Sequence, residues 1–173
     1  MGIVTTVGSA HTSEFGTIEA VAKGKGELIA ALPGEIDGGV AVLNADVPLV
    51  AAMADRTAAS IVTFGAAGDV RAENIALDDE LFPSFRVVSP WGNAELRLGA
   101  RGLHLVDNAL AALAAALALG IEIDDAAEGL AAPVLSPMRM SLSRVASGAR
   151  VLDDTYNANP MSVAAALRSL ALM

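Results

Sequence analysis

The order of apolar and polar residues in the first half of the chain predicts alternating strands and helices. From Thr17, a good N-cap, apolar residues recur at helical spacing until the Pro-Gly pair at 33–34 ends the helix. Two β-branched apolar runs, 40–43 and 61–64, are typical of buried strands, and Pro48 is well placed to start a short helix between them. A strand, a helix and a second strand in this order imply a parallel pair. We therefore expect an α/β fold with a parallel sheet and flanking helices.

The middle of the chain follows a different pattern. Three short segments, 70–77, 85–89 and 94–98, are separated by turn residues, which indicates a small antiparallel subsheet. Trp91 lies in the turn between the last two, and we expect it to cover an edge of the core. Residues 105–119 are so rich in alanine and leucine that we expect a buried, closely packed helix there.

Near the end of the chain, the segments 142–146 and 150–152 are expected to pair across a Ser-Gly turn. Asn159 and Pro160 are a good N-cap and a good first residue for a last helix. We expect this helix to bury the apolar side chains of Val163, Leu167 and Leu170. Because it has no stop signal, we also expect the natural chain to continue.

Composition narrows the possible functions. The 173 residues are one domain's worth of chain, 54% apolar, with a net charge of −9 from 11 Lys and Arg against 20 Asp and Glu. Nucleic-acid binding needs a basic surface, so this balance argues against it. There is no cysteine for a disulfide or a thiolate metal site. The N-terminus lacks a signal peptide, and polar residues interrupt the most apolar stretch, 103–120, so we expect a cytoplasmic protein without membrane insertion.

The stretch from Val151 to Pro160 combines a strand end with two adjacent carboxylates. Ligands bind at the carboxyl ends of strands in open α/β sheets, so Asp153 and Asp154 are placed to reach ribose hydroxyls or a metal ion. The same pair is equally compatible with a solvated turn. The pattern leaves both interpretations open.

Two further side chains are candidates for a site. Lys25 falls on the apolar stripe of the first helix, where lost solvation would favour a neutral, nucleophilic amine. The alternative is a lysine whose head reaches past the helix edge into water. Asn108 lies in the first turns of the alanine-rich helix, where its amide and the free helix N–H groups are placed to face a ligand.

Familiar catalytic motifs are missing. The only Gly-Lys pair, at 24–25, has Glu19 and Gly26 where a phosphate-binding loop of the Walker type needs glycine and Ser or Thr. The two histidines, His11 and His104, are not spaced as in a metal-binding helix or a known hydrolase motif. The residue pattern therefore gives little support to a hydrolase.

Several segments, in order along the chain, resemble the central domain of the Mur ligases. They are Gly8-Ser9-Ala10-His11, Phe15-Gly16, Ala22-Lys23-Gly24-Lys25-Gly26-Glu27-Leu28, Asn44-Ala45-Asp46, residues 102–112, Arg139-Met140 and Asp153-Asp154-Thr155-Tyr156-Asn157-Ala158-Asn159-Pro160. The last is the most specific and is similar to the branch that adds D-alanyl-D-alanine to the UDP-N-acetylmuramoyl tripeptide. The resemblance implies a partial P-loop-type ATPase domain whose Walker loop lies upstream of Met1. It makes residues 1–157 the C-terminal part of the central domain and 158–173 the start of the family's third domain.

The resemblance also implies residue roles in metal binding. His11 matches the histidine that helps to hold a catalytic magnesium ion. Lys25 matches the lysine that family members carbamylate, so that it becomes an anionic ligand bridging metal ions. This agrees with the position of Lys25 on the apolar stripe, because only a neutral amine can capture carbon dioxide.

For ATP, the resemblance implies a second set of residues. Asn108 matches the asparagine that contacts adenine, Arg139 an arginine near the phosphates and Asp154 the acid that binds the ribose. Tyr156 and Asn159 lie beside them in the same loop and belong to the same predicted cofactor site.

Some positions depart from the family pattern. Thr6 stands where the family usually has asparagine, Val47 where an acid often follows Asp46, and Leu105 where an asparagine follows the histidine. The lost amide at Leu105 indicates either a divergent ligase or a paralogue with weakened ATP binding.

Taken as a whole, the resemblance implies an ATP- and Mg²⁺-dependent amide ligase of peptidoglycan precursor synthesis. It would join UDP-MurNAc-tripeptide and D-Ala-D-Ala through an acyl phosphate. We expect a monomer, and we expect the 173-residue chain to be inactive alone. The alternatives are a ligase of the same superfamily with another amino-acid substrate and a non-catalytic binding module with the same fold.

Overall fold

The structure is a computed structural model that describes residues 1–8 and 16–173. Its first sheet consists of β1 (Gly2–Val4), β2 (Val40–Asn44) and β3 (Ser60–Phe64), parallel and in that order. Val42 of β2 lies opposite Ile3 and Val62 on the two neighbouring strands. The predicted parallel pair is confirmed, and β1 adds a third strand to it.

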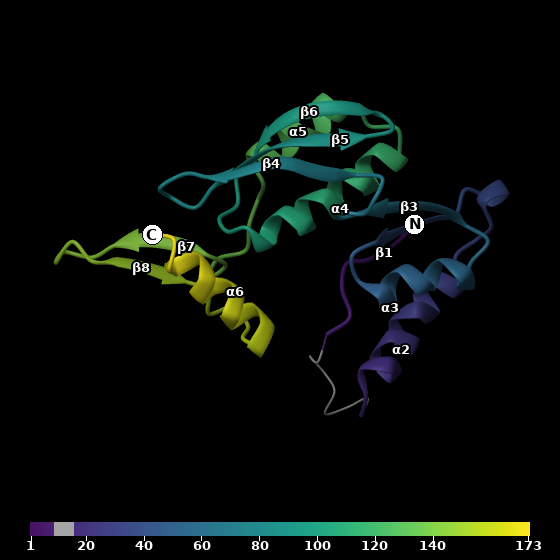
Figure 1. Cartoon of the computed structure of the whole chain (residues 1–173), viewed down its shortest axis with the longest axis horizontal. Helices are drawn as coiled ribbons and strands as arrows, with labels where there is room; N and C mark the ends of the chain where they lie inside the picture. Colours follow the sequence, from purple (N-terminus) through teal and green to yellow (C-terminus); the bar gives the residue numbers. More distant parts are fainter. Residues whose placement is uncertain (9–15) are drawn as a thin grey trace.

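Helices cover both faces of this sheet (Figure 1). The first, α2 (Ile18–Ala30), begins as predicted after Thr17, whose hydroxyl accepts a hydrogen bond from the Ala20 N–H at 3.2 Å. It shares a core with α3 (Pro48–Ala51) and η2 (Ala52–Arg56) on one face of the sheet, and the short η1 (Glu35–Asp37) precedes β2. On the other face lies α4 (His104–Ala118), as alanine-rich and buried as its sequence predicts.

The second sheet is the predicted antiparallel meander. It consists of β4 (Arg71–Leu77), β5 (Pro83–Ser89) and β6 (Gly92–Arg97). The apolar side of this sheet packs on α4, which therefore lies between the two sheets, and α5 (Ile123–Ala131) packs against β6. Trp91 is 45% exposed and is not among the buried residues of the core.

The C-terminal segment stands apart from this two-sheet body (Figure 1). It contains the predicted hairpin, β7 (Ser141–Arg144) and β8 (Arg150–Asp153), and α6 (Pro160–Leu170). Asn159 caps α6 as expected, with its Oδ1 accepting hydrogen bonds from the Met161 and Ser162 N–H groups at 3.0 Å.

The buried face predicted for α6 is not observed. Val163, Leu167 and Leu170 are 43%, 60% and 46% exposed, and Ser169 is the only buried residue of the helix. The amphipathic spacing is present, but within the described residues no layer covers that face. Nor, within the same residues, does any helix have both the length and the apolar character needed to cross a bilayer.

Candidate functional site

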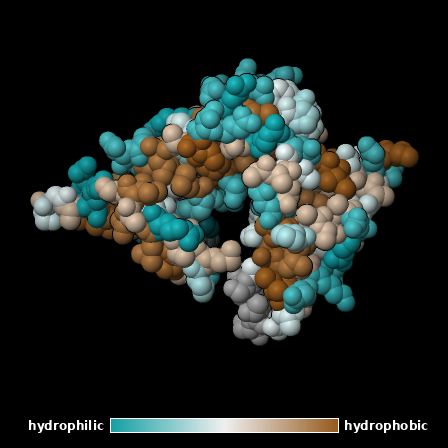
Figure 2. All heavy atoms as spheres, viewed as in Figure 1, coloured by the Kyte–Doolittle hydropathy of each residue, from teal (hydrophilic) through white to brown (hydrophobic). Residues whose placement is uncertain are grey.

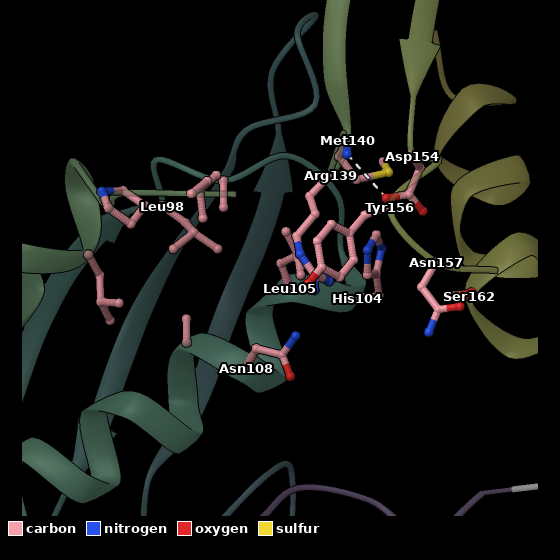
Figure 3. A pocket seen from close by; sticks show the side chains of 15 residues that line it. Leu98, His104, Leu105, Asn108, Arg139, Met140, Asp154, Tyr156, Asn157 and Ser162 are labelled. Carbon is pink, nitrogen blue, oxygen red and sulfur yellow. Dashed lines mark hydrogen bonds between the residues drawn. The ribbon is translucent and has the colours of Figure 1, made fainter. Parts of the chain in front are cut away.

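A cavity of about 430 Å³ lies between the start of α4, the segment after α5 and the connection from β8 to α6 (Figure 3). Its apolar wall consists of Leu98, Ala100, Leu105, Ala109, Leu130, Pro133 and Leu135. Polar side chains line the rest, among them Asn108, Arg139, Asp154 and Tyr156. Four of the predicted site residues, from segments up to 48 positions apart, therefore meet at one cavity.

Asn108 lies on the α4 side of this cavity. The helix holds it firmly, since the neighbouring residues Ala109 and Leu110 are buried between the two sheets. Its own side chain is exposed, and none of the hydrogen bonds among the described residues uses its amide. The amide is thus available to a ligand, as the sequence predicts.

Arg139 and Tyr156 are stacked at the opposite side of the cavity. The Arg139 Cζ lies 4.0 Å from the centroid of the Tyr156 ring, within the range of a cation–π interaction. The backbones of the two segments are also joined, because the Tyr156 N–H donates to the Met138 carbonyl at 3.1 Å. Met138 and Met140, on either side of Arg139, have φ values of 60° and 51°, a left-handed conformation that non-glycine residues rarely adopt.

The two adjacent aspartates have different roles. Asp153 Oδ1 accepts hydrogen bonds from the N–H and the hydroxyl of Thr155, at 3.1 and 2.7 Å, so this carboxylate closes its own turn. Asp154 lines the cavity, and its Oδ1 accepts a hydrogen bond from the Met140 N–H at 3.2 Å. The turn interpretation therefore holds for Asp153, and Asp154 is the one of the pair that lines the cavity.

His104, the first residue of α4, also lines the cavity, and sequence reasoning missed it. Its Nδ1 is buried without a hydrogen-bond partner among the described residues. Burial lowers the pKa of His104 below its ordinary value, while Asp154 acts in the opposite direction and Arg168 adds to the lowering. Gly102, with φ of +105°, leaves room for the imidazole ring. A Gly-x-His sequence at a helix start was the one available signal.

Lys25 faces a second, more open cleft of about 660 Å³. Figure 2 shows a hollow between the C-terminal segment and the α2–α3 side of the molecule. Thr6, His104, Asn159 and several α6 residues line the cleft with it. Lys25 is exposed, with its Nζ donating to the Thr6 carbonyl at 2.8 Å. Of the two interpretations of its position, the structure therefore agrees with the lysine whose head group reaches past the helix edge, and not with the core-facing one. The buried positions of α2 are Val21, Ala22, Gly26 and Ile29, and Lys25 lies beside that face.

Of the two predicted metal ligands, Lys25 and His11, only Lys25 lies among the described residues. His11 falls outside the described residues, so its position relative to Lys25 is not part of the structure. Within residues 1–8 and 16–173, no three His, Asp or Glu side chains are grouped as ligands of a metal ion. Asn159 lines the Lys25 cleft, but its Oδ1 is already used to cap α6. Only its Nδ2 is left for a ligand.

Asn44 and Asp46 tie together the carboxyl ends of the parallel strands. Asn44 donates through Nδ2 to the Thr5 carbonyl at 2.9 Å and accepts from the Asp46 N–H at 2.9 Å. The Asp46 carboxylate accepts from the N–H groups of Ala66 and Ala67, at 2.6 and 2.9 Å. These side chains shape the sheet edge that leads toward Lys25, and their own acceptor atoms are occupied.

The chain was compared with known proteins by sequence and by structure. Residues 1–116 match the family model of the Mur ligase middle domain. The UDP-N-acetylmuramoyl-tripeptide–D-alanyl-D-alanine ligase of Mycobacterium bovis is 45% identical over 99% of this chain and 34% of its own length. The ligase of the same name from Escherichia coli K12 is 33% identical over 99% of this chain and 38% of its length. The chain thus spans about a third of these relatives.

Solved structures give the same result. The crystal structure of MurF from Acinetobacter baumannii superimposes with a TM-score of 0.90 at 33% identity, over 99% of this chain and 37% of that one. MurF ligase from Thermotoga maritima, solved in complex with ADP, gives 0.81 at 25% identity, over 98% and 38% of the two chains. These matches confirm the predicted fold class, and with the match over residues 1–116 they show that the chain belongs to the Mur ligase family.

Proposed function

We propose that the chain is part of an ATP-dependent ligase that joins D-Ala-D-Ala to UDP-MurNAc-tripeptide. The observation that carries this proposal is the cavity where Asn108, Arg139 and Asp154 meet, in a chain whose relatives bear that ligase's name. Because the chain spans about a third of those relatives, the activity would belong to the full-length protein.

The cavity supports a nucleotide site with a division of roles. A volume of about 430 Å³ with a largely apolar wall suits a purine base and its ribose. Asn108 would hydrogen-bond the edge of adenine, and Asp154 would accept hydrogen bonds from ribose hydroxyls. Arg139, at the polar side, would contact the phosphates, and Tyr156 and Asn159 complete the surroundings. Leu105 takes part in the apolar wall, so it would support the base by packing.

Lys25 and His11 are proposed to hold magnesium. An amine whose head group is open to solvent is accessible to carbon dioxide, and Lys25 is exposed at the cleft beside the nucleotide cavity. The carbamate would supply the oxygen ligands that Mg²⁺ prefers, with the imidazole of His11 as a neighbouring ligand. The sequence argument for this role was burial of Lys25, which the structure does not show. The support now comes from the position of Lys25 at the cleft.

The proposed reaction has two steps. The γ-phosphoryl group of ATP passes to a carboxylate of the tripeptide, giving an acyl phosphate and ADP. The amine of D-Ala-D-Ala then attacks the acyl carbon, an amide bond forms and phosphate leaves. Bound magnesium would neutralise phosphate charge, and Arg139 would add a fixed positive charge at the cavity mouth. The chain's own residues serve mainly to position the nucleotide.

The proposal includes the organisation of the protein. We place the domain boundary between residues 157 and 158, so that α6 begins the third domain. We also propose a cytoplasmic, monomeric enzyme that binds no nucleic acid, in keeping with its net charge of −9.

Phosphate release by the full-length protein tests the substrates. We expect release from ATP only when both UDP-MurNAc-tripeptide and D-Ala-D-Ala are present. Release that ignores the dipeptide would contradict the assignment. The second candidate, a ligase for a single amino acid, has support from UDP-N-acetylmuramate–L-alanine ligase of Phenylobacterium zucineum, 33% identical over 98% of this chain. Release triggered by a free amino acid would favour it.

Lys25 can be tested against a neighbour on the same helix. We expect Lys25→Ala to abolish ligation in the full-length protein, whereas Lys23→Ala, also exposed on α2, should leave it nearly unchanged. Circular dichroism of both variants controls for folding. Full activity of a well-folded Lys25→Ala variant would remove Lys25 from the proposed site. For the 173-residue chain alone we expect little or no ATP affinity, and tight binding by calorimetry would contradict this.

A further inference from the structure

We propose that Tyr156 is a positioning residue that holds Arg139 at the nucleotide cavity. The proposal rests on the nucleotide site of the proposed function, and it assigns a role to a side chain that otherwise only lines the cavity. Figure 3 shows the two side chains together, one from the segment before β7 and the other from the connection after β8.

The first observation is the stack itself. The Arg139 Cζ lies 4.0 Å from the Tyr156 ring centroid, and both side chains line the cavity. Arg139 forms no ion pair within the described part of the chain, and its side chain is exposed. A long exposed arginine samples many rotamers unless something restrains it. The ring of Tyr156 supplies that restraint.

The second observation is the backbone beneath the stack. Met138 and Met140 both adopt left-handed conformations, so Arg139 projects from an unusual double bend. Hydrogen bonds hold both sides of this bend: the Tyr156 N–H donates to the Met138 carbonyl and Asp154 Oδ1 accepts from the Met140 N–H. The connection after β8 thus fixes Arg139 twice, through the main chain and through the ring.

Stacking leaves arginine's binding capacity intact. The ring contacts the face of the guanidinium, while the N–H donors lie in its plane and point outward. Arg139 can therefore be restrained by Tyr156 and still donate hydrogen bonds to phosphate oxygens. The hydroxyl of Tyr156 takes no part in the stack, so a phenylalanine at this position should restrain Arg139 equally well.

Nuclear magnetic resonance of the 173-residue chain tests the stack without nucleotide. The Arg139 side-chain protons should show ring-current shifts that persist in Tyr156→Phe and vanish in Tyr156→Leu. All these variants keep the main-chain N–H of residue 156, so the comparison isolates the ring. Arg144, an exposed arginine on β7, should keep its shifts throughout. Arg139 shifts that are unchanged in Tyr156→Leu would overturn the proposal.

ATP binding and turnover by the full-length protein test the consequence. For a stack at an exposed site, Tyr156→Leu should weaken ATP binding or turnover by roughly two- to fivefold, with Tyr156→Phe close to wild type. In an Arg139→Ala background, Tyr156→Leu should have almost no further effect, because Tyr156 acts through Arg139.

Two outcomes would contradict the positioning role of Tyr156, and a third would contradict the proposed function. Equal losses in Tyr156→Phe and Tyr156→Leu would show that the hydroxyl matters, and full additivity with Arg139→Ala would show that Tyr156 acts independently. Either would overturn this proposal while the wild-type protein still used ATP. A wild-type protein that neither binds nor hydrolyses ATP would overturn the proposed function, and the role of the pair with it.

Discussion

Asn108→Ala should change stability and nucleotide binding in opposite directions. Asn108 is exposed near the start of a 15-residue helix, and no hydrogen bond among the described residues uses its amide. Its removal therefore costs the fold nothing that the structure shows. Alanine is the better helix former, so the variant should be more stable by about 0.5 kcal/mol.

We expect Asn108→Ala to weaken ATP binding. If the amide makes two hydrogen bonds to adenine, each worth roughly 0.5–1.5 kcal/mol net, the affinity of the full-length protein for ATP should fall by roughly fivefold to a hundredfold. Urea unfolding of the 173-residue chain measures the first quantity, and calorimetric titration of the full-length protein with ATP measures the second.

Ala112→Asn is the matched control. Residue 112 is exposed on the same face of α4, one turn further along, and does not line the cavity. The substitution should lower stability by about 0.5 kcal/mol and leave ATP affinity unchanged. Destabilisation of the chain by more than about 1 kcal/mol in Asn108→Ala would show that the amide stabilises the fold and would contradict the first expectation. Unaltered ATP affinity in the same variant would contradict the second.

The remaining predictions concern the fold around the cavity. Leu113→Ala, at a fully buried position of α4, should cost about 3 kcal/mol in urea unfolding. Leu119→Ala, 68% exposed, should cost less than about 0.5 kcal/mol. Because the pKa of His104 is lowered on folding, the unfolded chain binds more protons just below the ordinary value of 6.5. Wild type should therefore lose stability relative to His104→Gln as the pH falls below that value, and parallel pH profiles would contradict the burial argument. Gly102→Ala meets both a positive φ and the His104 ring, whose Cε1 would lie 2.7 Å from the new Cβ. It should cost more than Gly120→Ala, which has a positive φ but open space and should cost about 1 kcal/mol.

Local patterns predicted most of the fold because they coincide with what the structure buries. The run at 40–43 is apolar on both sides, and β2 is covered by helices on both faces. In β3, Val62 and Phe64 are buried on the α4 side, whereas Ile61 on the other side is 39% exposed. The caps at Thr17 and Asn159 mark the helix starts because their side-chain oxygens satisfy free N–H groups. β1 was harder to predict, since a three-residue strand is too short to show a period.

The failures have a common physical cause. A helical stripe predicts which residues share a face, but the neighbouring layers decide how much of that face is covered. Lys25 lies at the margin of the α2 stripe and reaches the Thr6 carbonyl, which only the tertiary structure places there. In the same way, the α6 stripe is real and yet exposed. Sequence spacing also could not predict the contact between Arg139 and Tyr156, because the β7–β8 hairpin brings these two residues together.

The candidate site is built from two parts with different mechanical character. One part is α4, whose buried residues pack between the two sheets and so hold the exposed Asn108 in place at the cavity. The other is residues 138–157, which are mostly exposed and contain the β7–β8 hairpin, with the base of the hairpin joined by two hydrogen bonds and the Arg139–Tyr156 stack. Few buried contacts mean a low cost of local opening, so this second part should open far more easily than α4. The base is then expected to meet a preformed surface, whereas the ribose and phosphates meet one whose geometry depends on Tyr156 and Asp154. For this reason substitutions there should affect the placement of phosphate more than the stability of the fold.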